Sequence, residues 1–188
     1  MQLLAPGIYC YRFDNTKTFL QLAKHSSLYK RGFVNYGKAG NRPTRITSIL
    51  NPVMLNQEEN ADVFGALDTL NADLLAIVNQ YRLEFDLEEL TKETEWLIMR
   101  YDEGDYFDTH KDEDPSYDRT VAIVAYLNDD YTGGELEFPD FKLSVKPKAG
   151  DALVFPGSFA YRHRVKPITS GVRYAVVNWF KFRDRQKN

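Results

Sequence analysis

The second half of this chain is a series of short apolar runs, each ended by residues that favour turns. The runs lie at 96–101, 119–127, 134–138, 141–145, 151–155, 160–166 and 172–182. Turn residues separate them, as in Thr132-Gly133-Gly134 and Pro156-Gly157. Runs of this length are typical of β-strands. Many strands joined by turns favour a sandwich or jelly roll over alternating βαβ units.

The first half has a different pattern and predicts supporting helices. Within residues 58–82, apolar residues recur at intervals of three and four, which is one face of a long helix. Residues 17–25 predict a short helix, and residues 29–52, with several Gly and Pro, predict irregular or extended structure. We therefore expect one mainly β domain over 1–188, with a helical or irregular support region at 1–93 and a strand core at 94–184.

Composition narrows the classes of protein and partner. A length of 188 residues suits one domain, and a formal net charge of −3 gives no basic footprint for nucleic acid. The single Cys10 excludes an internal disulfide and a thiolate metal cluster. The N-terminal segment lacks the pattern of a signal peptide, and no apolar run is long enough to span a membrane. We expect a cytoplasmic protein with neither a membrane nor a nucleic acid as partner.

Three side chains predict a metal site, namely His110, Asp112 and His163. Residues two apart share a face of a strand, so His110 and Asp112 can reach one ion together. Two imidazoles and one carboxylate occupy one face of an octahedral ferrous ion and leave the opposite face open. Taken singly, His163 could belong to a basic surface patch and Asp112 to a solvated acidic loop. Zinc can use the same three ligands.

Arg173 favours iron over zinc, as does the lack of an obvious general base for hydrolysis. Residues 167–171 have the composition of a turn, which would place Arg173 nearly opposite His163 in an antiparallel hairpin. A guanidinium at that position can hold a carboxylate with two hydrogen bonds. The pattern predicts a dicarboxylate cosubstrate whose ketone end chelates iron and whose far end binds Arg173, with a coordination position left for dioxygen.

Further motifs follow in a fixed order along residues 95–182. They are Tyr101-x-x-Gly104-x-x-Phe107-x-x-His110-x-Asp112, Ala125-Tyr126-Leu127-Asn128, Thr132-Gly133-Gly134-Glu135-Leu136, Ala149-Gly150-Asp151, His163-Arg164-Val165-x-Pro167, Gly171-x-Arg173-Tyr174 and Trp179. In this order they resemble the prolyl 4-hydroxylase family of 2-oxoglutarate- and Fe(II)-dependent dioxygenases. Phe107 stands where many members of the family carry tyrosine. Collagen-type members carry lysine where Arg173 stands.

The resemblance implies a fold and a set of site residues. The fold is a double-stranded β-helix, a cupin-like jelly roll, flanked by N-terminal helices. Iron is expected at His110, Asp112 and His163, which would be the catalytic centre, and the far carboxylate of 2-oxoglutarate at Arg173. Three aromatic residues complete the expected cosubstrate pocket. Tyr126 would donate a hydrogen bond to that carboxylate, Tyr101 would line the pocket near the iron, and Trp179 would form its wall; for Tyr126 and Trp179, core packing is the alternative.

The implied activity is hydroxylation of a protein or peptide residue, with proline favoured, and release of succinate and CO2. The expected cofactors are Fe(II), with 2-oxoglutarate and O2 as cosubstrates and ascorbate as a further candidate. Hydroxylation of a free amino acid or small metabolite is an alternative, as is a non-catalytic jelly-roll binding module. A nucleic-acid demethylase is disfavoured, because Trp179 stands where such relatives carry a second arginine.

Overall fold

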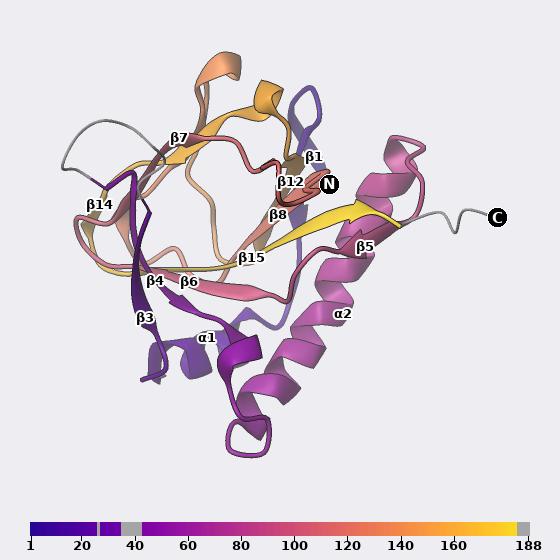
Figure 1. The fold of residues 1–188 in the computed structure, drawn as a ribbon. Helices are drawn as coiled ribbons and strands as arrows, with labels where there is room; N and C mark the ends of the chain where they lie inside the picture. The colour runs from indigo at the N-terminus through magenta and orange to yellow at the C-terminus, as the bar shows by residue number, and fades with distance from the viewer. Residues whose placement is uncertain (26, 35–42, 184–188) are drawn as a thin grey trace.

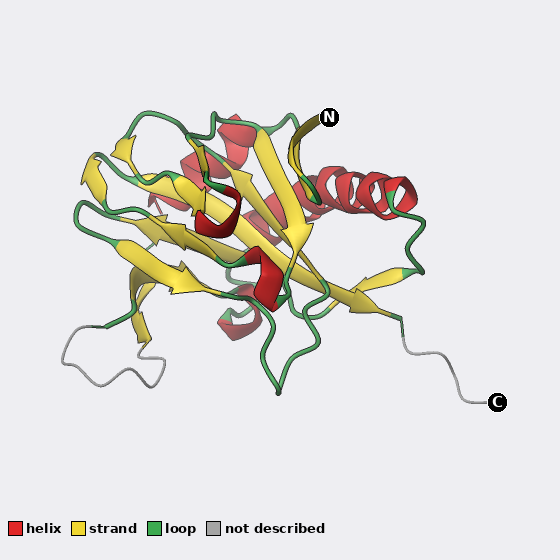
Figure 2. Cartoon of the chain, turned by 90° about the horizontal axis from the view of Figure 1, so that it is seen from above, coloured by secondary structure: helices red, strands yellow, loops and turns green. Residues whose placement is uncertain are grey.

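The computed structural model describes residues 1–25, 27–34 and 43–183. Its two α-helices, α1 (Thr16–His25) and α2 (Ala61–Glu84), lie against a large curled sheet (Figures 1 and 2). Both helices agree with the periodicity of the sequence. The described residues also form three short 3-10 turns, which are η1 (Pro52–Met54), η2 (Pro139–Phe141) and η3 (Phe159–Tyr161). Within the described residues, no helix is both long and apolar enough to cross a membrane.

The main sheet runs continuously through strands that are distant in sequence. Its order is β1 (Gln2–Ala5), β2 (Ile8–Arg12), β12 (Asp151–Pro156), β8 (Val121–Tyr126), β15 (Arg173–Phe182), β6 (Leu97–Tyr101), β4 (Arg45–Leu50), β7 (Tyr106–His110), β13 (His163–Val165), β10 (Leu136–Phe138) and β11 (Leu143–Val145). Further strands are β3 (Lys30–Val34) beside β4, β5 (Leu90–Lys92) beside β15, and the separate pair β9 (Thr132–Gly133) and β14 (Ile168–Ser170). The sheet curls into a nearly closed barrel (Figure 1). The expected jelly-roll class is confirmed.

Alternation along β15 divides the interior into two cores. Side chains on one face of the strand line an internal pocket, namely Arg173, Ala175, Val177 and Trp179. Those on the other face pack in the cluster that α1 and α2 cover, namely Tyr174, Val176 and Phe180. Because successive residues of a strand point to opposite faces, one strand supplies both the pocket and the packing that holds it in place.

The first 93 residues contain more β structure than the sequence predicted. Strands β3 and β4 lie within residues 29–52, which we expected to be irregular or extended, whereas β1, β2 and β5 lie where helical or irregular support was expected. This part of the prediction is wrong, because short strands such as β1 and β2 depend on pairing with distant partners rather than on a local pattern. In β2, Cys10 pairs with Leu153 and Tyr9 with Val154 of β12. The division into a support region and a core remains a prediction.

Candidate metal and cosubstrate site

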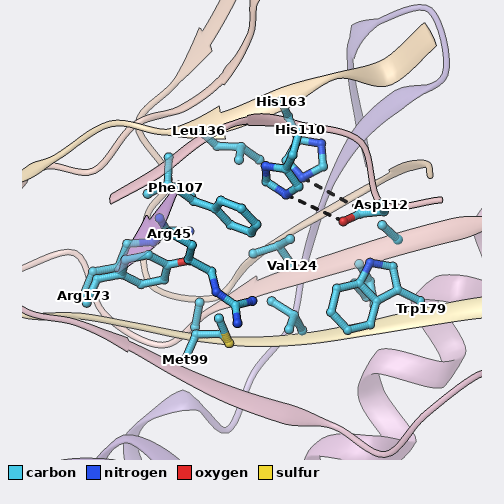
Figure 3. A pocket seen from close by; sticks show the side chains of 16 residues that line it. Arg45, Met99, Phe107, His110, Asp112, Val124, Leu136, His163, Arg173 and Trp179 are labelled. Carbon is cyan, nitrogen blue, oxygen red and sulfur yellow. Dashed lines mark ion pairs between the residues drawn. The ribbon is translucent and has the colours of Figure 1, made fainter. Parts of the chain in front are cut away.

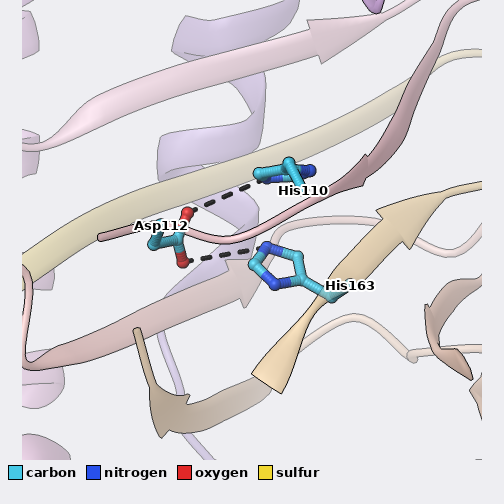
Figure 4. Close-up of side chains that lie close together, drawn as sticks. All are labelled: His110, Asp112 and His163. Atoms are coloured by element: carbon cyan, nitrogen blue, oxygen red, sulfur yellow. Dashed lines mark ion pairs between the residues drawn. The ribbon is translucent and has the colours of Figure 1, made fainter. Parts of the chain in front are cut away.

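His110, Asp112 and His163 lie together inside the curled sheet (Figure 4). The two histidines end β7 and begin β13, and they are direct cross-strand partners. Their Nε2 atoms lie 3.8 Å and 3.7 Å from the two carboxylate oxygens of Asp112. One ligand atom from each residue falls within 4.8 Å of the others. Asp112 and His163 are buried.

Asp112 reaches this cluster from a bend rather than from a strand. His110 and Asp112 do lie close together, but the expectation that both stand on one strand is wrong, because β7 ends at His110. Instead, the backbone N–H groups of Asp112 and Glu113 both donate to the carbonyl oxygen of Gly157, at 3.2 Å and 2.9 Å. These two hydrogen bonds fix the bend and aim the carboxylate inward.

The hydrogen bonds of the two imidazoles leave the inward nitrogens free for a metal. His110 Nδ1 lies 2.8 Å from the carbonyl of Asp108, and His163 Nδ1 lies 3.1 Å from the carbonyl of Tyr161. A carbonyl only accepts, so each Nδ1 carries the proton and each Nε2 is a lone-pair donor. Burial, and next the neighbouring His163, hold the pKa of His110 well below its usual range. Two imidazole nitrogens with one carboxylate fit a divalent iron ion.

Arg173 lies in an aromatic enclosure beside the cluster. Its side chain is 1 % exposed, and its Cζ atom lies 5.0 Å from the ring centre of Tyr101 and 4.9 Å from that of Tyr126. Nε and Nη1 of Arg173, the hydroxyl of Tyr126 and the hydroxyl of Tyr131 are buried without a hydrogen-bond partner. Such groups are costly to leave unpaired. Donors of this kind, gathered around one cation, fit a carboxylate ligand.

The predicted hairpin between His163 and Arg173 is wrong. Arg173 pairs with Tyr101 of β6, whereas His163 pairs with His110 of β7. The segment between them instead forms β14, which pairs with β9. Arg173 and His163 nevertheless line the same pocket, because the sheet curls and brings β15 to face β7 and β13 across it (Figure 3).

The pocket itself is narrow, with a cavity volume of about 60 Å³. Tyr101 and Trp179 line it together with the three candidate ligands and Arg173 (Figure 3). Tyr126 is fully buried and is not among the lining residues, so its contact with the site is through Arg173. The ligand and cosubstrate roles given to all these residues remain predictions.

Three residues at the site were missed by the sequence reasoning, namely Tyr131, Arg119 and Arg45. Tyr131 directly precedes the motif Thr132-Gly133-Gly134. A Cβ added to Gly134 would lie 3.1 Å from the Tyr131 ring, so the glycine motif could have pointed to Tyr131. Arg119 lies with its Cζ 4.0 Å from the ring centre of Trp179 and donates to the Asp112 carbonyl at 3.3 Å. Arg45 lies in a region that was expected to be irregular or extended, where no motif marked it.

Comparison with known proteins agrees with this geometry. Residues 96–181 match the model of the 2OG-Fe(II) oxygenase superfamily. The match covers 86 of the 188 residues. The match includes all three candidate metal ligands and Arg173. Fe(II), 2-oxoglutarate and O2 are the cofactor and cosubstrates that this superfamily uses.

The proteins that this chain is similar to include a curated hydroxylase and two solved prolyl hydroxylases that share its fold. A PKHD-type hydroxylase of Synechococcus sp. is 35% identical over 103 residues, which are 48% of this chain and 45% of the relative. A prolyl hydroxylase of Trichoplax adhaerens, solved with a peptide fragment of hypoxia inducible factor, has a TM-score of 0.73 at 21% identity and covers 93% of this chain and 83% of that one. A Pseudomonas putida prolyl-4-hydroxylase has a TM-score of 0.64 at 21% identity, covering 94% and 93%. The chain matches about half the length of the curated relatives.

Proposed function

We propose that this protein is a 2-oxoglutarate- and Fe(II)-dependent dioxygenase that hydroxylates a protein or peptide residue, with proline favoured. Succinate and CO2 would be the coproducts. One observation carries the proposal, which is that a cluster of two imidazoles and a carboxylate shares a pocket with a buried guanidinium, two of whose nitrogens have no hydrogen-bond partner. This combination suits a ligand that chelates a metal at one end and carries a carboxylate at the other.

Each residue has a distinct role in this proposal. His110, Asp112 and His163 would hold Fe(II), which with O2 and 2-oxoglutarate supplies the oxidising chemistry. Arg173 would bind the far carboxylate of 2-oxoglutarate through Nε and Nη1, which are the atoms left without partners. Tyr126 would donate a hydrogen bond from its hydroxyl group to the same carboxylate. Tyr101 and Trp179 would form walls that orient the ligands and exclude water.

The substrate class is inferred by analogy with relatives. The Trichoplax adhaerens enzyme was solved with a peptide, and a putative prolyl 4-hydroxylase of Acanthamoeba polyphaga mimivirus is 28% identical over 130 residues. We further propose that residues 1–188 act as one catalytic unit, because β2 and β4 pair with strands of the core sheet. A cytoplasmic location is proposed because a reducing compartment suits a ferrous centre.

Mass spectrometry tests the proposed function directly. The protein would be incubated with Fe(II), ascorbate, 2-oxoglutarate and a set of proline-containing peptides, with Asp112→Ala as the control variant. We expect succinate formation and the gain of one oxygen atom on a peptide proline, both lost in the variant. Turnover confined to free amino acids or metabolites would replace the peptide substrate. Succinate formation by the variant equal to that of the native protein would refute the metal site.

A further inference from the structure

Arg45 is a second arginine of the same pocket. It lies on β4, directly opposite Phe107 of β7, and both side chains line the pocket (Figure 3). The Cζ atom of Arg45 lies 5.3 Å from the ring centre of Phe107. The same ring also stacks on His110, with ring centres 3.5 Å apart and an angle of 12° between the planes. A single aromatic ring therefore bridges Arg45 and a candidate metal ligand.

Arg45 has no carboxylate partner among the described residues. Its Nε is buried and makes no hydrogen bond, and no described acidic side chain forms an ion pair with it. Two nearby arginines differ in this respect, because Arg31 pairs with Asp105 and Arg100 with Asp102. Phe107, directly opposite, offers a ring face but no oxygen. The sequence of residues 35–42 contains no Asp or Glu either.

The charges of the proposed cofactor and cosubstrate leave Arg45 uncompensated. The two positive charges of Fe(II), less the negative charge of Asp112, leave one positive charge at the metal. Together with Arg173, this balances the two negative charges of 2-oxoglutarate. Arg45 adds one more positive charge to the lining of this pocket; its side chain is half-buried, and its Nε is fully buried and unpaired. A buried polar group without a partner is costly. A neutral substrate would leave that cost unrelieved.

We propose that Arg45 binds a carboxylate of the substrate, so that the oxidised residue lies next to an acidic group. The carboxylate belongs either to an Asp or Glu beside the oxidised residue or to the free C-terminus of a peptide that ends there. The inference rests on the proposed function for the position of the substrate. It adds a residue that selects the substrate by charge, while the metal and cosubstrate residues stay the same.

Matched peptides test this inference by binding, independently of turnover. The protein would be loaded with Mn(II) and saturating 2-oxoglutarate, and peptides would be titrated by calorimetry. One pair differs only by Glu or Gln next to proline, with amidated C-termini. A second pair is neutral in sequence and ends at the residue after proline, with a free or an amidated C-terminus. The variants are Arg45→Gln, Arg45→Lys, and Arg12→Gln as a control on an exposed ion pair.

For the native protein and for Arg12→Gln, we expect one of the charged peptides to bind more tightly than its neutral partner. One charge-assisted hydrogen bond corresponds to roughly 10- to 100-fold in affinity. Arg45→Gln should abolish this preference, whereas Arg45→Lys should keep part of it because the charge remains. Which pair shows the preference identifies the source of the carboxylate. The affinity for 2-oxoglutarate should be unchanged in all variants.

Two results would overturn the inference. In the first, the native protein binds charged and neutral peptides equally. In the second, Arg45→Gln weakens 2-oxoglutarate and leaves peptide preference intact, which would make Arg45 a cosubstrate residue. Failure of the proposed function is seen separately, as a native protein that neither binds 2-oxoglutarate with Mn(II) nor forms succinate with Fe(II). In that case the same peptide titrations, made without 2-oxoglutarate, still report on Arg45, because they require no turnover.

Discussion

Replacing Arg173 with methionine should separate cosubstrate binding from folding. The guanidinium is 1 % exposed, and two of its nitrogens have no partner. Burying such a charge costs several kcal/mol, while contact with two aromatic rings returns about 2 kcal/mol each. These contributions nearly cancel, and methionine fills much of the same space. We expect the free energy of unfolding of Arg173→Met without ligand to lie within about 1–2 kcal/mol of the native value.

The response to 2-oxoglutarate should change far more. With Mn(II) bound and cosubstrate at 100 times its Kd, the native protein gains about 2.7 kcal/mol. Loss of two charge-assisted hydrogen bonds, at roughly 1.5–3 kcal/mol each, weakens binding at least ~100-fold. At the same concentration the variant would then gain only about 0.4 kcal/mol. For a chain of this length, the native gain corresponds to roughly 5–11 °C in Tm.

Thermal unfolding followed by circular dichroism measures both quantities, with Mn(II) present and with or without 2-oxoglutarate. Arg12→Met is the matched control, because it also removes a guanidinium, but from an exposed ion pair with Asp151. It should keep the full shift. If Arg173→Met also kept the full shift, Arg173 would not bind the cosubstrate. If it lost more than about 3 kcal/mol without ligand, its role would be structural and the reasoning from unpaired donors would be refuted.

Three further perturbations test the site and the fold. Asp112→Asn should lose most of its Mn(II) affinity, because the only carboxylate of the cluster disappears. A near-native affinity of the variant for Mn(II), measured by calorimetry, would contradict the proposed ligands. Gly133→Ala should lower the free energy of unfolding, measured in urea, by about 2 kcal/mol or more, because Gly133 has φ +71 and a Cβ would clash with the Pro167 carbonyl. Gly65→Ala is the control: it lies in α2 with open space around it, and it should raise the free energy of unfolding by about 0.5–1 kcal/mol. Burial raises the pKa of Cys10 to about 11 from 9.0, so iodoacetamide should alkylate the native protein slowly at pH 8. The free energy of unfolding should fall as pH rises from 9 to 11, because only the thiol of the unfolded chain ionises readily in that range. Rapid alkylation of the native protein, or a flat stability profile relative to Cys10→Ser, would contradict this pKa.

The residues of the candidate site could be selected from the sequence, but their spatial arrangement could not. Spacing and order were enough to select His110, Asp112, His163 and Arg173. The pairing of His163 with His110 joins residues more than fifty positions apart, and it depends on how the whole sheet curls. A local pattern predicts a strand and its faces, whereas the partner of that strand is decided by competition among all the strands. For this reason the predicted hairpin to Arg173 was wrong while its place in the pocket was right.

The strands of the first half were hidden for a similar reason. β4 has the sequence Arg45-Ile46-Thr47-Ser48-Ile49-Leu50, in which apolar residues do not alternate cleanly. Its strand structure follows from pairing with β6 and β7, which carry the recognisable motifs. A residue such as Arg45 therefore enters the pocket without any signal in its own segment. Only the register, Arg45 opposite Phe107, brings it to the site.

Unpaired polar atoms mark the site independently of any motif. Nine buried side-chain nitrogen or oxygen atoms of the described residues have no hydrogen-bond partner, and six of them belong to Arg45, Arg119, Tyr126, Tyr131 and Arg173. A folded protein rarely leaves such atoms unpaired, and those of Arg45 and Arg173 belong to residues that line the same pocket, which indicates that bound ligands complete their hydrogen bonds there. Three of these five residues lie outside the positions that the sequence motifs selected. The motifs thus select the candidate metal and cosubstrate residues, while the unpaired atoms point to further residues around them.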